Sequence, residues 1–467
     1  MTNFGLAKVC ITPKIGTKVI GQPIQIKTDG KYNDLYARSF YLNSNSGDLL
    51  LVSCDLLILP KENTDNIRIK ISEKTGIGFN NIVIHTTHTH AGPAVADIFN
   101  EKTSDPETQE KIINSIIDSG VKSYNKQQTG KIGIGREYLY GISFNRRYIM
   151  KDGTVEMHPH KNDPNLLEAE GPNDPELNSI ILFDIENNPV GALANFPCHL
   201  TSLERNNSKF SADFPYYAEE VLRKKLSNDD FVMLYLNGPC GNLCQVDVKN
   251  SETFEVGDQH SRRVGKRFAD AVNKIINNCT FLNDNINIDI AYSEIGIPIR
   301  KITDKMINKA KEIIEKNKDK DIDEFKLSNY GLESYKDTTV ISAQKLLETE
   351  FWKNMSANEI VSLSEAYKDN KKEVVPLTVV KIGSILLITV PAELFVEYSL
   401  NLKNIFKEKY KNIIVVELVN GWVGYVPTKK AFSSNSGYEV QFLNSSKLCE
   451  DAGDIITKEI IQMEKGL

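Results

Sequence analysis

The chain has 467 residues, of which 40% are hydrophobic and 25% are charged, so it is long enough to bury a large core. Its formal net charge is −6, from 56 Lys and Arg against 62 Asp and Glu, which argues against nucleic acid as a general partner. The sequence contains no apolar run that approaches the ~20 residues needed to cross a bilayer, so we expect no transmembrane segment.

The N-terminus and the cysteines indicate the compartment. The first residues lack a basic stretch followed by an apolar core, so no secretory signal is expected. Seven scattered cysteines without such a signal favour reduced thiols and a cytoplasmic location. Cys240 and Cys244 have a spacing that can bind metal, but no second cysteine pair accompanies them, so zinc at this pair is disfavoured.

The first part of the chain alternates strand-like and helix-like segments. Apolar runs predict strands at 48–55 and 81–85, and the segment at 64–74 predicts a helix between them. A second helix is expected to begin at Asp105-Pro106-Glu107, which offers an N-cap, a proline in the first turn and a favourable acidic charge. This order predicts an α/β core of layered sheets flanked by helices.

Three of the seven histidines lie in the stretch 82–93, where a buried strand is expected to enter a loop. They are His85, His88 and His90, and Ala-Gly-Pro at 91–93 then ends any regular element. Alternate residues of an extended chain share a face, so His88 and His90 are expected to point the same way. A single histidine is more often a hydrogen-bonded core residue, but this pair favours metal binding or acid–base chemistry.

Charged residues in the first half have competing interpretations. Arg38 and Asp55 lie in or at the end of predicted strands, and a structural ion pair is at least as well supported as a functional role. Arg146 belongs to a basic pair with Arg147, and the residues alone favour a surface position. His158 and His160 flank a proline in a polar loop, and we assign them no role.

A second strand-end histidine follows in the middle of the chain. A strand is predicted at 190–196, and His199 comes shortly after it. Another strand at 231–236 leads into a glycine-rich turn at 237–244, which lacks the lysine and the spacing of a phosphate-binding loop.

Residues 301–375 differ in character, because they are dense in Lys, Glu and Asp and have few strand signals. We expect a helical insertion outside the core, with a solvated decoration favoured over a lid. The pattern Ser-Ala-Asn-Glu at 356–359 predicts a helix start within it.

The last part of the chain returns to strands, at 385–390 and 413–419. A helix is expected to begin at Pro391 and to carry Glu393 in its first turn. Tyr425 and Tyr438 follow the last strand, and core packing is the ordinary role of a single tyrosine.

Several of these strings, in order along the chain, resemble motifs of the neutral/alkaline ceramidase superfamily of zinc amidohydrolases. The resemblance runs from Gly5 to about Glu439. The strings are Thr-His-Thr-His-Ala-Gly-Pro at 87–93, Asn-Arg at 145–146, His-Leu-Thr-Ser at 199–202, Val-Pro-Ala-Glu at 390–393, Tyr-Val-Pro-Thr at 425–428 and Gly-Tyr-Glu at 437–439. The chain departs from the family at Ala91, where the motif has Ser, and at Asn242, where it has Asp.

The resemblance implies a mixed α/β catalytic unit over 1–467 with the helical insertion at 301–375. It implies a zinc ion held by four ligands, which are His88, His199, Glu393 and Tyr425. As chemistry, two histidines and a carboxylate are a known catalytic zinc pattern, in which zinc activates a water molecule for attack on an amide carbonyl. All four ligands are expected to lie at one edge of the sheet layers.

Three further residues are expected to have catalytic roles, His90 because of its spacing and Arg146 and Tyr438 because of the resemblance. His90, two residues from a ligand, is placed to move protons rather than to bind zinc. Arg146 and Tyr438 match positions that face the substrate, and either of them, or Tyr425, could stabilise the negative charge on the carbonyl oxygen.

The implied substrate is a small-molecule or lipid-like amide, such as an N-acylated sphingolipid of lipid metabolism. The family's C-terminal β-sandwich domain is not recognised in this sequence, and no basic amphipathic helix suggests membrane docking. A small soluble ester, lactone or cyclic ketone opened by hydrolysis therefore remains the alternative. A non-catalytic metal- or ligand-binding scaffold is disfavoured, because every ligand position is kept.

Overall fold

The computed structural model describes residues 2–467 apart from 22–25, 45, 99–104, 204–206, 251–255, 284–285 and 319–346. Within these residues the chain forms three units with the same topology. Each unit has two antiparallel strand pairings, then a strand, helix and strand in which the two strands are parallel. A further helix follows each unit. The repetition is a feature of the fold that the sequence did not reveal.

The first unit contains β1 (Thr2–Cys10), β5 (Tyr36–Asn43), β6 (Asp48–Cys54), α1 (Lys61–Thr75) and β7 (Ile82–Thr86), followed by α2 (Pro106–Asn125). The second contains β9 (Gln127–Tyr138), β14 (Glu176–Phe183), β15 (Pro189–Phe196), α3 (Phe214–Leu226) and β17 (Val232–Asn237), followed by α4 (Asp258–Asn278). The third contains β20 (Ile288–Pro298), β21 (Lys372–Ile382), β22 (Ile385–Thr389), α9 (Val396–Phe406) and β24 (Asn412–Val416), followed after intervening short elements by α11 (Ala452–Glu464).

Short elements decorate the connections between these strands. They are β2 (Lys18–Ile20), β3 (Ile26–Lys27), β4 (Gly30–Lys31), β8 (Gly92–Pro93), β10 (Phe144–Asn145), β11 (Arg147–Met150), β12 (Val155–Met157), β13 (Leu166–Ala169), β16 (Lys209–Phe210), β18 (Leu243–Cys244), β19 (Thr280–Phe281), β23 (Glu393–Leu394), β25 (Tyr425–Val426) and α10 (Lys429–Ser434). No helix among the described residues is long and apolar enough to cross a membrane.

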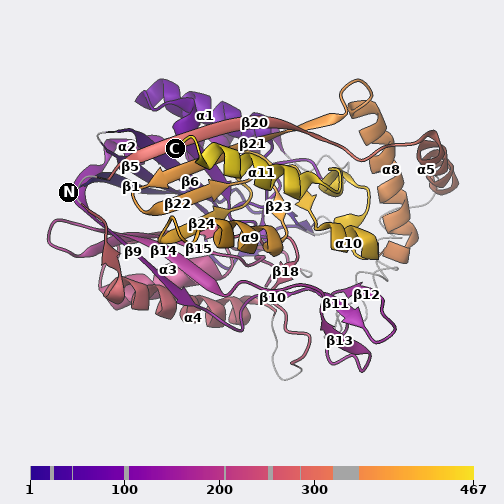
Figure 1. Ribbon diagram of the computed structural model, residues 1–467, viewed down its shortest axis with the longest axis horizontal. Helices are drawn as coiled ribbons and strands as arrows, with labels where there is room; N and C mark the ends of the chain where they lie inside the picture. Colours follow the sequence, from indigo (N-terminus) through magenta and orange to yellow (C-terminus); the bar gives the residue numbers. More distant parts are fainter. Residues whose placement is uncertain are drawn as a thin grey trace.

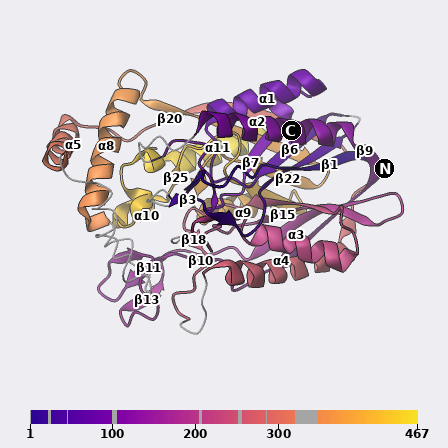
Figure 2. The ribbon, with the colours of Figure 1, turned by 180° about the vertical axis from the view of Figure 1, so that it is seen from behind.

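The three units pack around a shared apolar core. Because β1 pairs with β9, the first two units form one sheet in the order β17-β15-β14-β9-β1-β5-β6-β7, while the third forms its own sheet, β20-β21-β22-β24. Phe40, Leu234 and Leu387, one from each unit, lie in the core between the sheets. Helices cover the outside, with α1 and α2 over the first unit, α3 and α4 over the second, and α9 and α11 over the third (Figures 1 and 2).

The mixed α/β architecture of layered sheets and flanking helices is confirmed, and the predicted strands are present. The start of α2 is also as predicted, because the Asp105 side chain caps the helix by accepting from Thr108 N–H, with Pro106 in the first turn. The last predicted strand is shorter than expected and ends at Val416. Leu418 and Asn420 have positive φ, so the chain turns before 419.

The predicted helix at Pro391 is wrong in position. Glu393 lies instead in β23, which pairs in parallel with β25 so that Glu393 is directly opposite Tyr425. The Glu393 N–H donates to the carbonyl oxygen of Gly424, which belongs to a distant segment, so this backbone group is paired as in a sheet and not as in a helix. The helix α9 begins later, at Val396.

The insertion is helical where it is described, with α5 (Asp304–Asn317) and α8 (Glu350–Ala366), but its end is earlier than predicted because β21 begins at Lys372. The helix start predicted at 356–359 is wrong, since α8 is capped by Thr349 and runs through those residues. The solvated decoration is also wrong for α8, because its apolar side chains Phe351 and Met355 pack with Leu443 in a separate buried cluster.

Arg38 and Asp55 form the structural ion pair, with 2.7 Å between Arg38 Nη1 and Asp55 Oδ2. Arg38 Nε also lies 2.7 Å from Glu219 Oε2, and the other Glu219 oxygen accepts from Lys8 and Arg223. Glu219 is buried, and its one carboxylate forms ion pairs with three cations, Arg38, Lys8 and Arg223.

Replacing Glu219 by alanine is expected to lower the free energy of unfolding by about 3–5 kcal/mol, because Arg38 and its neighbours lose a buried counterion. Urea denaturation measures this loss. The matched control is Glu220→Ala on the same helix, where a partly exposed pair with Arg223 is removed and a change within about 0.5 kcal/mol is expected. Equal effects of the two substitutions would contradict the role of Glu219.

Candidate metal centre

The predicted site residues come from the loops that follow the parallel strands of all three units. His88 follows β7, His199 follows β15, Glu393 follows β22 and Tyr425 follows β24. Parallel strands bring their carboxyl ends to the same edge of a sheet, where site residues commonly collect. Because the three units pack around one core, these edges meet, and the structure brings the four side chains together.

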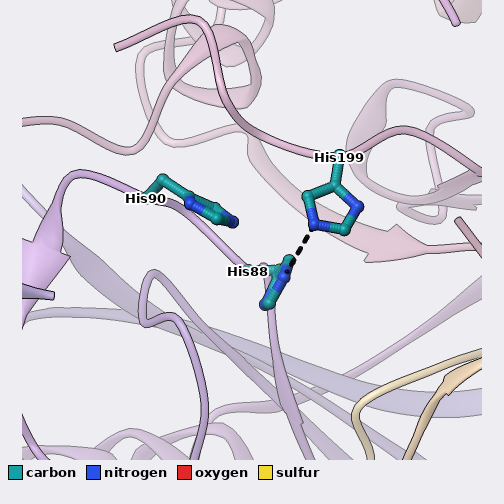
Figure 3. Close-up of side chains that lie close together, drawn as sticks. All are labelled: His88, His90 and His199. Carbon is teal, nitrogen blue, oxygen red and sulfur yellow. Dashed lines mark hydrogen bonds between the residues drawn. The ribbon is translucent and has the colours of Figure 1, made fainter. Parts of the chain in front are cut away.

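His88 and His199 face each other with 3.1 Å between their Nε2 atoms, the contact drawn as a dashed line in Figure 3. The Nδ1 atom of His88 lies 2.9 Å from Leu57 O, and that of His199 lies 3.0 Å from Cys240 O. A carbonyl oxygen only accepts, so each Nδ1 carries a hydrogen, and each Nε2 presents a lone pair when its ring is neutral. Two facing lone pairs need a shared proton or a cation between them.

Glu393 completes this arrangement. Its Oε2 atom lies 3.3 Å from His88 Nε2 and 3.7 Å from His199 Nε2, and it has no hydrogen-bond partner in the described part of the chain. Burial alone would raise the pKa of Glu393, but interactions with His88, Tyr425 and Trp422 lower it to about 2. The group is therefore a buried carboxylate directed at two imidazole lone pairs.

These three atoms fit a bound cation. Ligand atoms of a tetrahedral zinc ion, at about 2.0–2.2 Å from the metal, lie roughly 3.3–3.6 Å from each other. The separations of 3.1, 3.3 and 3.7 Å are close to that range. The assignment of His88, His199 and Glu393 as ligands stays a prediction, and the residues present have the chemistry that it requires.

Tyr425 lies against the same carboxylate. Its backbone is paired with Glu393, and its hydroxyl interacts with the Glu393 side chain. Burial and the charge of Glu393 raise the pKa of the Tyr425 hydroxyl well above its usual value, so it is protonated without a cation beside it. Its role as a fourth ligand stays a prediction.

His90 joins the group from the same loop as His88. Its Nδ1 lies 2.9 Å from Gly21 O, so its Nε2 also carries a lone pair, and the nitrogen atoms of the three histidines lie within 4.8 Å of one another. Figure 3 shows the three rings converging on a common space. This placement suits a proton-transfer group and also a ligand.

The extended geometry predicted for His88 and His90 is wrong. β7 ends at Thr86, and His88 has a φ of 62°, in the left-handed region that a residue with a side chain rarely adopts. The loop therefore curls, and the two rings approach edge to face with 4.9 Å between their centroids. Backbone strain of this kind is often concentrated at functional sites.

Arg146 is buried rather than exposed, so the surface position favoured by the sequence is wrong. Its Nε lies 3.0 Å from Glu439 Oε1, and its Nη2 donates to Gly241 O at 2.6 Å. The guanidinium carbon lies 5.6 Å from the ring centre of Tyr425 and 5.5 Å from that of Tyr438. The structure therefore brings both predicted substrate-facing residues, Arg146 and Tyr438, to the candidate site.

His85 and the cysteine pair do not join the site. His85 Nδ1 contacts Ser53 Oγ at 2.9 Å and its Nε2 accepts from Asn237 N–H, so both ring nitrogens are used in the core. Cys240 Sγ donates to Glu417 and lies 3.4 Å from His199 Nδ1, on the side of the ring away from the converging Nε2 atoms, while Cys244 Sγ donates to a backbone carbonyl. The two thiols therefore make separate contacts.

Sequence reasoning missed residues that hold the site in place. Trp422 Nε1 donates to Glu393 Oε1 at 2.9 Å. Buried Glu417 accepts from the backbone N–H groups of Cys240 and Leu394, and so fixes the carbonyl that orients His199 and the segment that carries Glu393. The glycine-rich turn has a packing role, because a Cβ at Gly241 would lie 2.4 Å from the carbonyl oxygen of Glu393.

A cavity of about 140 Å³ opens from these residues. His88, His90 and Glu393 line one part of it. Trp352 and Glu359 line another part and come from α8, which the sequence placed outside the core. The insertion thus forms part of the wall of the candidate site.

Comparisons with known proteins agree with this geometry. A family described as neutral/alkaline non-lysosomal ceramidase, N-terminal, matches residues 5–258. The chain is 26% identical over 279 residues to a neutral ceramidase of Pseudomonas aeruginosa, an alignment that covers 57% of this chain and 40% of that protein. It is 25% identical over 228 residues to neutral ceramidase A of Dictyostelium discoideum, covering 45% of this chain and 30% of the relative.

The fold is also shared with a solved structure. The crystal structure of neutral ceramidase from Pseudomonas aeruginosa superposes with a TM-score of 0.72 at 18% identity, covering 99% of this chain and 74% of that one. The sequence alignments span 40% or less of the length of these curated relatives.

Proposed function

The chain belongs to the neutral/alkaline non-lysosomal ceramidase family, and from this premise we propose that it is a zinc-dependent hydrolase of amide bonds. The observation that carries the proposal is the pair of imidazole lone pairs facing each other at 3.1 Å beside the Glu393 carboxylate. We further propose that residues 1–467 act as one catalytic unit, since all three units contribute to the site.

In this proposal His88, His199, Glu393 and Tyr425 hold the metal. A zinc ion in such a site acidifies a water molecule and polarises a carbonyl oxygen. The protein's contribution is orientation, because the backbone carbonyls of Leu57 and Cys240 fix the tautomer and direction of the two ligand rings.

His90 is the proposed proton carrier. Its Nδ1 hydrogen is held by Gly21 O, so its Nε2 is the atom that accepts a proton from the attacking water. The same nitrogen then donates the proton to the leaving amine, which an amide needs because an amine anion is a poor leaving group. This assignment is supported by the position of His90 next to His88 and His199.

Tyr438 is the proposed group that binds the carbonyl oxygen. Tyr438 and Tyr425 both line the cavity, and Arg146 lies near the two rings, where its charge opposes the rise in the pKa of Tyr425 that burial and Glu393 cause. Arg146 is itself fixed by Glu439 and Gly241 O, so it supports this surface without moving.

The substrate in this proposal is an N-acylated small molecule or lipid. The alternative, a small soluble ester, lactone or cyclic ketone, is favoured by the modest volume of the cavity, about 140 Å³. We also propose a cytoplasmic location, supported by the seven free thiols.

Metal removal tests the proposal. The purified protein is expected to contain about one zinc per chain, and dialysis against a chelator should abolish hydrolysis of fluorescent N-acyl amides until zinc is restored. A parallel panel of esters and lactones identifies the alternative substrate class. Unchanged turnover after complete zinc removal would contradict the proposal, and bound zinc without turnover of any panel member would favour the non-catalytic scaffold.

A further inference from the structure

The third unit brings the side chain of Glu359 to the cavity, a position that the sequence did not indicate. In each unit the connection between the first and second strands reaches the site. That connection supplies Gly21 in the first unit, Arg146 in the second, and Trp352 with Glu359 in the third. By this repetition the insertion containing α8 occupies the place of a site loop, and its polar residues are candidates for substrate recognition.

Glu359 is a buried carboxyl group on the wall of this cavity. Its side chain is 2% exposed, and one oxygen, Oε2, accepts from Asn444 N–H at 3.0 Å. No other hydrogen bond to this group comes from the described residues, which leaves an oxygen for a ligand. Burial raises the pKa of Glu359 to about 7, against the opposing effects of Asn444 N–H and Lys447. A buried carboxyl with so few partners is costly unless a ligand uses it.

The charge of the nearby Lys447 acts on Glu359, but the hydrogen bonds of its ammonium group go to other residues. Lys447 Nζ donates to the carbonyl oxygens of Val423 and Asn444, and its ion pair is with Glu373 at 3.6 Å. Among the described ion pairs none joins Lys447 to Glu359. The charge of Glu359 is therefore available to a cation that enters the cavity.

Aromatic rings surround the same space. Both tryptophans of the chain, Trp352 and Trp422, line the cavity, and the Trp352 ring lies 6.0 Å from that of Tyr438. The faces of such rings attract cations, and the attraction increases where water is excluded. Lys447 lies 5.8 Å from the ring centre of Trp422, and Arg146 lies 5.5 Å from that of Tyr438. The Trp352 ring together with the Glu359 carboxylate is therefore the chemistry that would recognise an alkylammonium group.

We propose that this part of the cavity binds a protonated amine of the substrate, so that the preferred substrates are amides that carry a second, cationic amine. Glu359 pairs with the ammonium group, Trp352 and Tyr438 contact its alkyl chain, and the amide lies at His88 and His90. The preference among hydrolysed amides rests on the proposed hydrolase function, whereas the binding of the amine does not depend on it.

Binding alone tests the amine subsite. Titrating the zinc-loaded protein with n-butylammonium at pH 8 should change tryptophan fluorescence, because both tryptophans line the cavity. The neutral isostere 1-butanol should bind on the order of ten-fold more weakly. Equal affinity for the two probes would overturn the inference, whether or not any variant folds.

Glu359→Gln should remove the preference for n-butylammonium and leave the affinity for 1-butanol unchanged. The matched control is Glu365→Gln, an exposed position on the same helix, which should retain the preference. Zinc content should be equal in the unmodified protein and in both variants, since Glu359 is not among the predicted ligands. A preference for ammonium that survives in Glu359→Gln would contradict the role of this residue.

Turnover then separates this inference from the proposed function. The N-acyl amide of ethylenediamine should exceed that of propylamine by on the order of ten-fold in kcat/KM, and Glu359→Gln should abolish the difference, mainly through KM. Equal hydrolysis of both amides overturns the inference and leaves the hydrolase standing. Selective ammonium binding without hydrolysis of either amide supports the subsite and counts against the hydrolase.

Discussion

His88→Ala is expected to yield a folded protein without zinc, in which amide hydrolysis falls by more than about 10⁴-fold. The substitution removes one of the two facing Nε2 lone pairs. Of the three predicted ligands whose atoms lie closest together, only His199 and Glu393 then remain. Enzyme rate enhancements are on the order of 10⁶-fold or more, and in the proposed function most of the enhancement would depend on the metal ion. Metal analysis of the purified variant and steady-state rates give the two readouts.

The matched control is His160→Ala, in a loop that the structure does not bring into the metal cluster. It should retain zinc and turnover. Circular dichroism and thermal unfolding separate loss of metal from loss of fold in His88→Ala. Stoichiometric zinc in His88→Ala would show that another group, with His90 the first candidate, completes the ligand set.

The strand ends that carry the site could be predicted from local sequence. The runs before His88 and His199 are apolar, and both histidines lie in the loops that follow the buried strands β7 and β15. Hydrophobic runs and the residues that end them are local properties, so a single sequence shows them. The residues that cap α2 at Asp105 were predictable for the same reason.

Features that depend on distant parts of the chain could not be predicted this way. Glu393 is in a strand because it pairs with Tyr425, and a helix was the better local choice after Pro391. Arg146 is buried because it pairs with Glu439. This counterion lies 293 positions away along the chain, so the local sequence around Arg146 does not reveal it. Glu359 reaches the cavity through the packing of α8, which a charge-rich composition does not indicate.

The threefold repetition also lies beyond local sequence. The three units share strand order and pairing, although their connections between the first two strands differ widely in length. Topology places those connections at one site, so each unit can contribute different chemistry there. A backbone oxygen comes from Gly21, a guanidinium from Arg146 and a carboxyl from Glu359.

His90→Ala is expected to leave zinc bound and to lower turnover by roughly 10²–10⁴-fold, the usual contribution of a general acid–base group. The reason is geometric, since the ring of His90 lies 4.9 Å from that of His88 and 5.4 Å from that of His199. Its Nδ1 is held by Gly21 O, which directs the basic Nε2 towards the reacting water. The measurement is zinc stoichiometry together with kcat for the best substrate of the amide panel.

Leaving-group dependence distinguishes proton transfer from a structural role of His90. An activated anilide departs with little protonation, so His90→Ala should hydrolyse it much closer to the wild-type rate than it hydrolyses an alkyl amide. A loop that His90 merely orients would slow both substrates equally. Full zinc with near-normal rates on alkyl amides would refute the catalytic role. An empty site in His90→Ala would instead make His90 a ligand and show that Glu393 or Tyr425 has been misassigned.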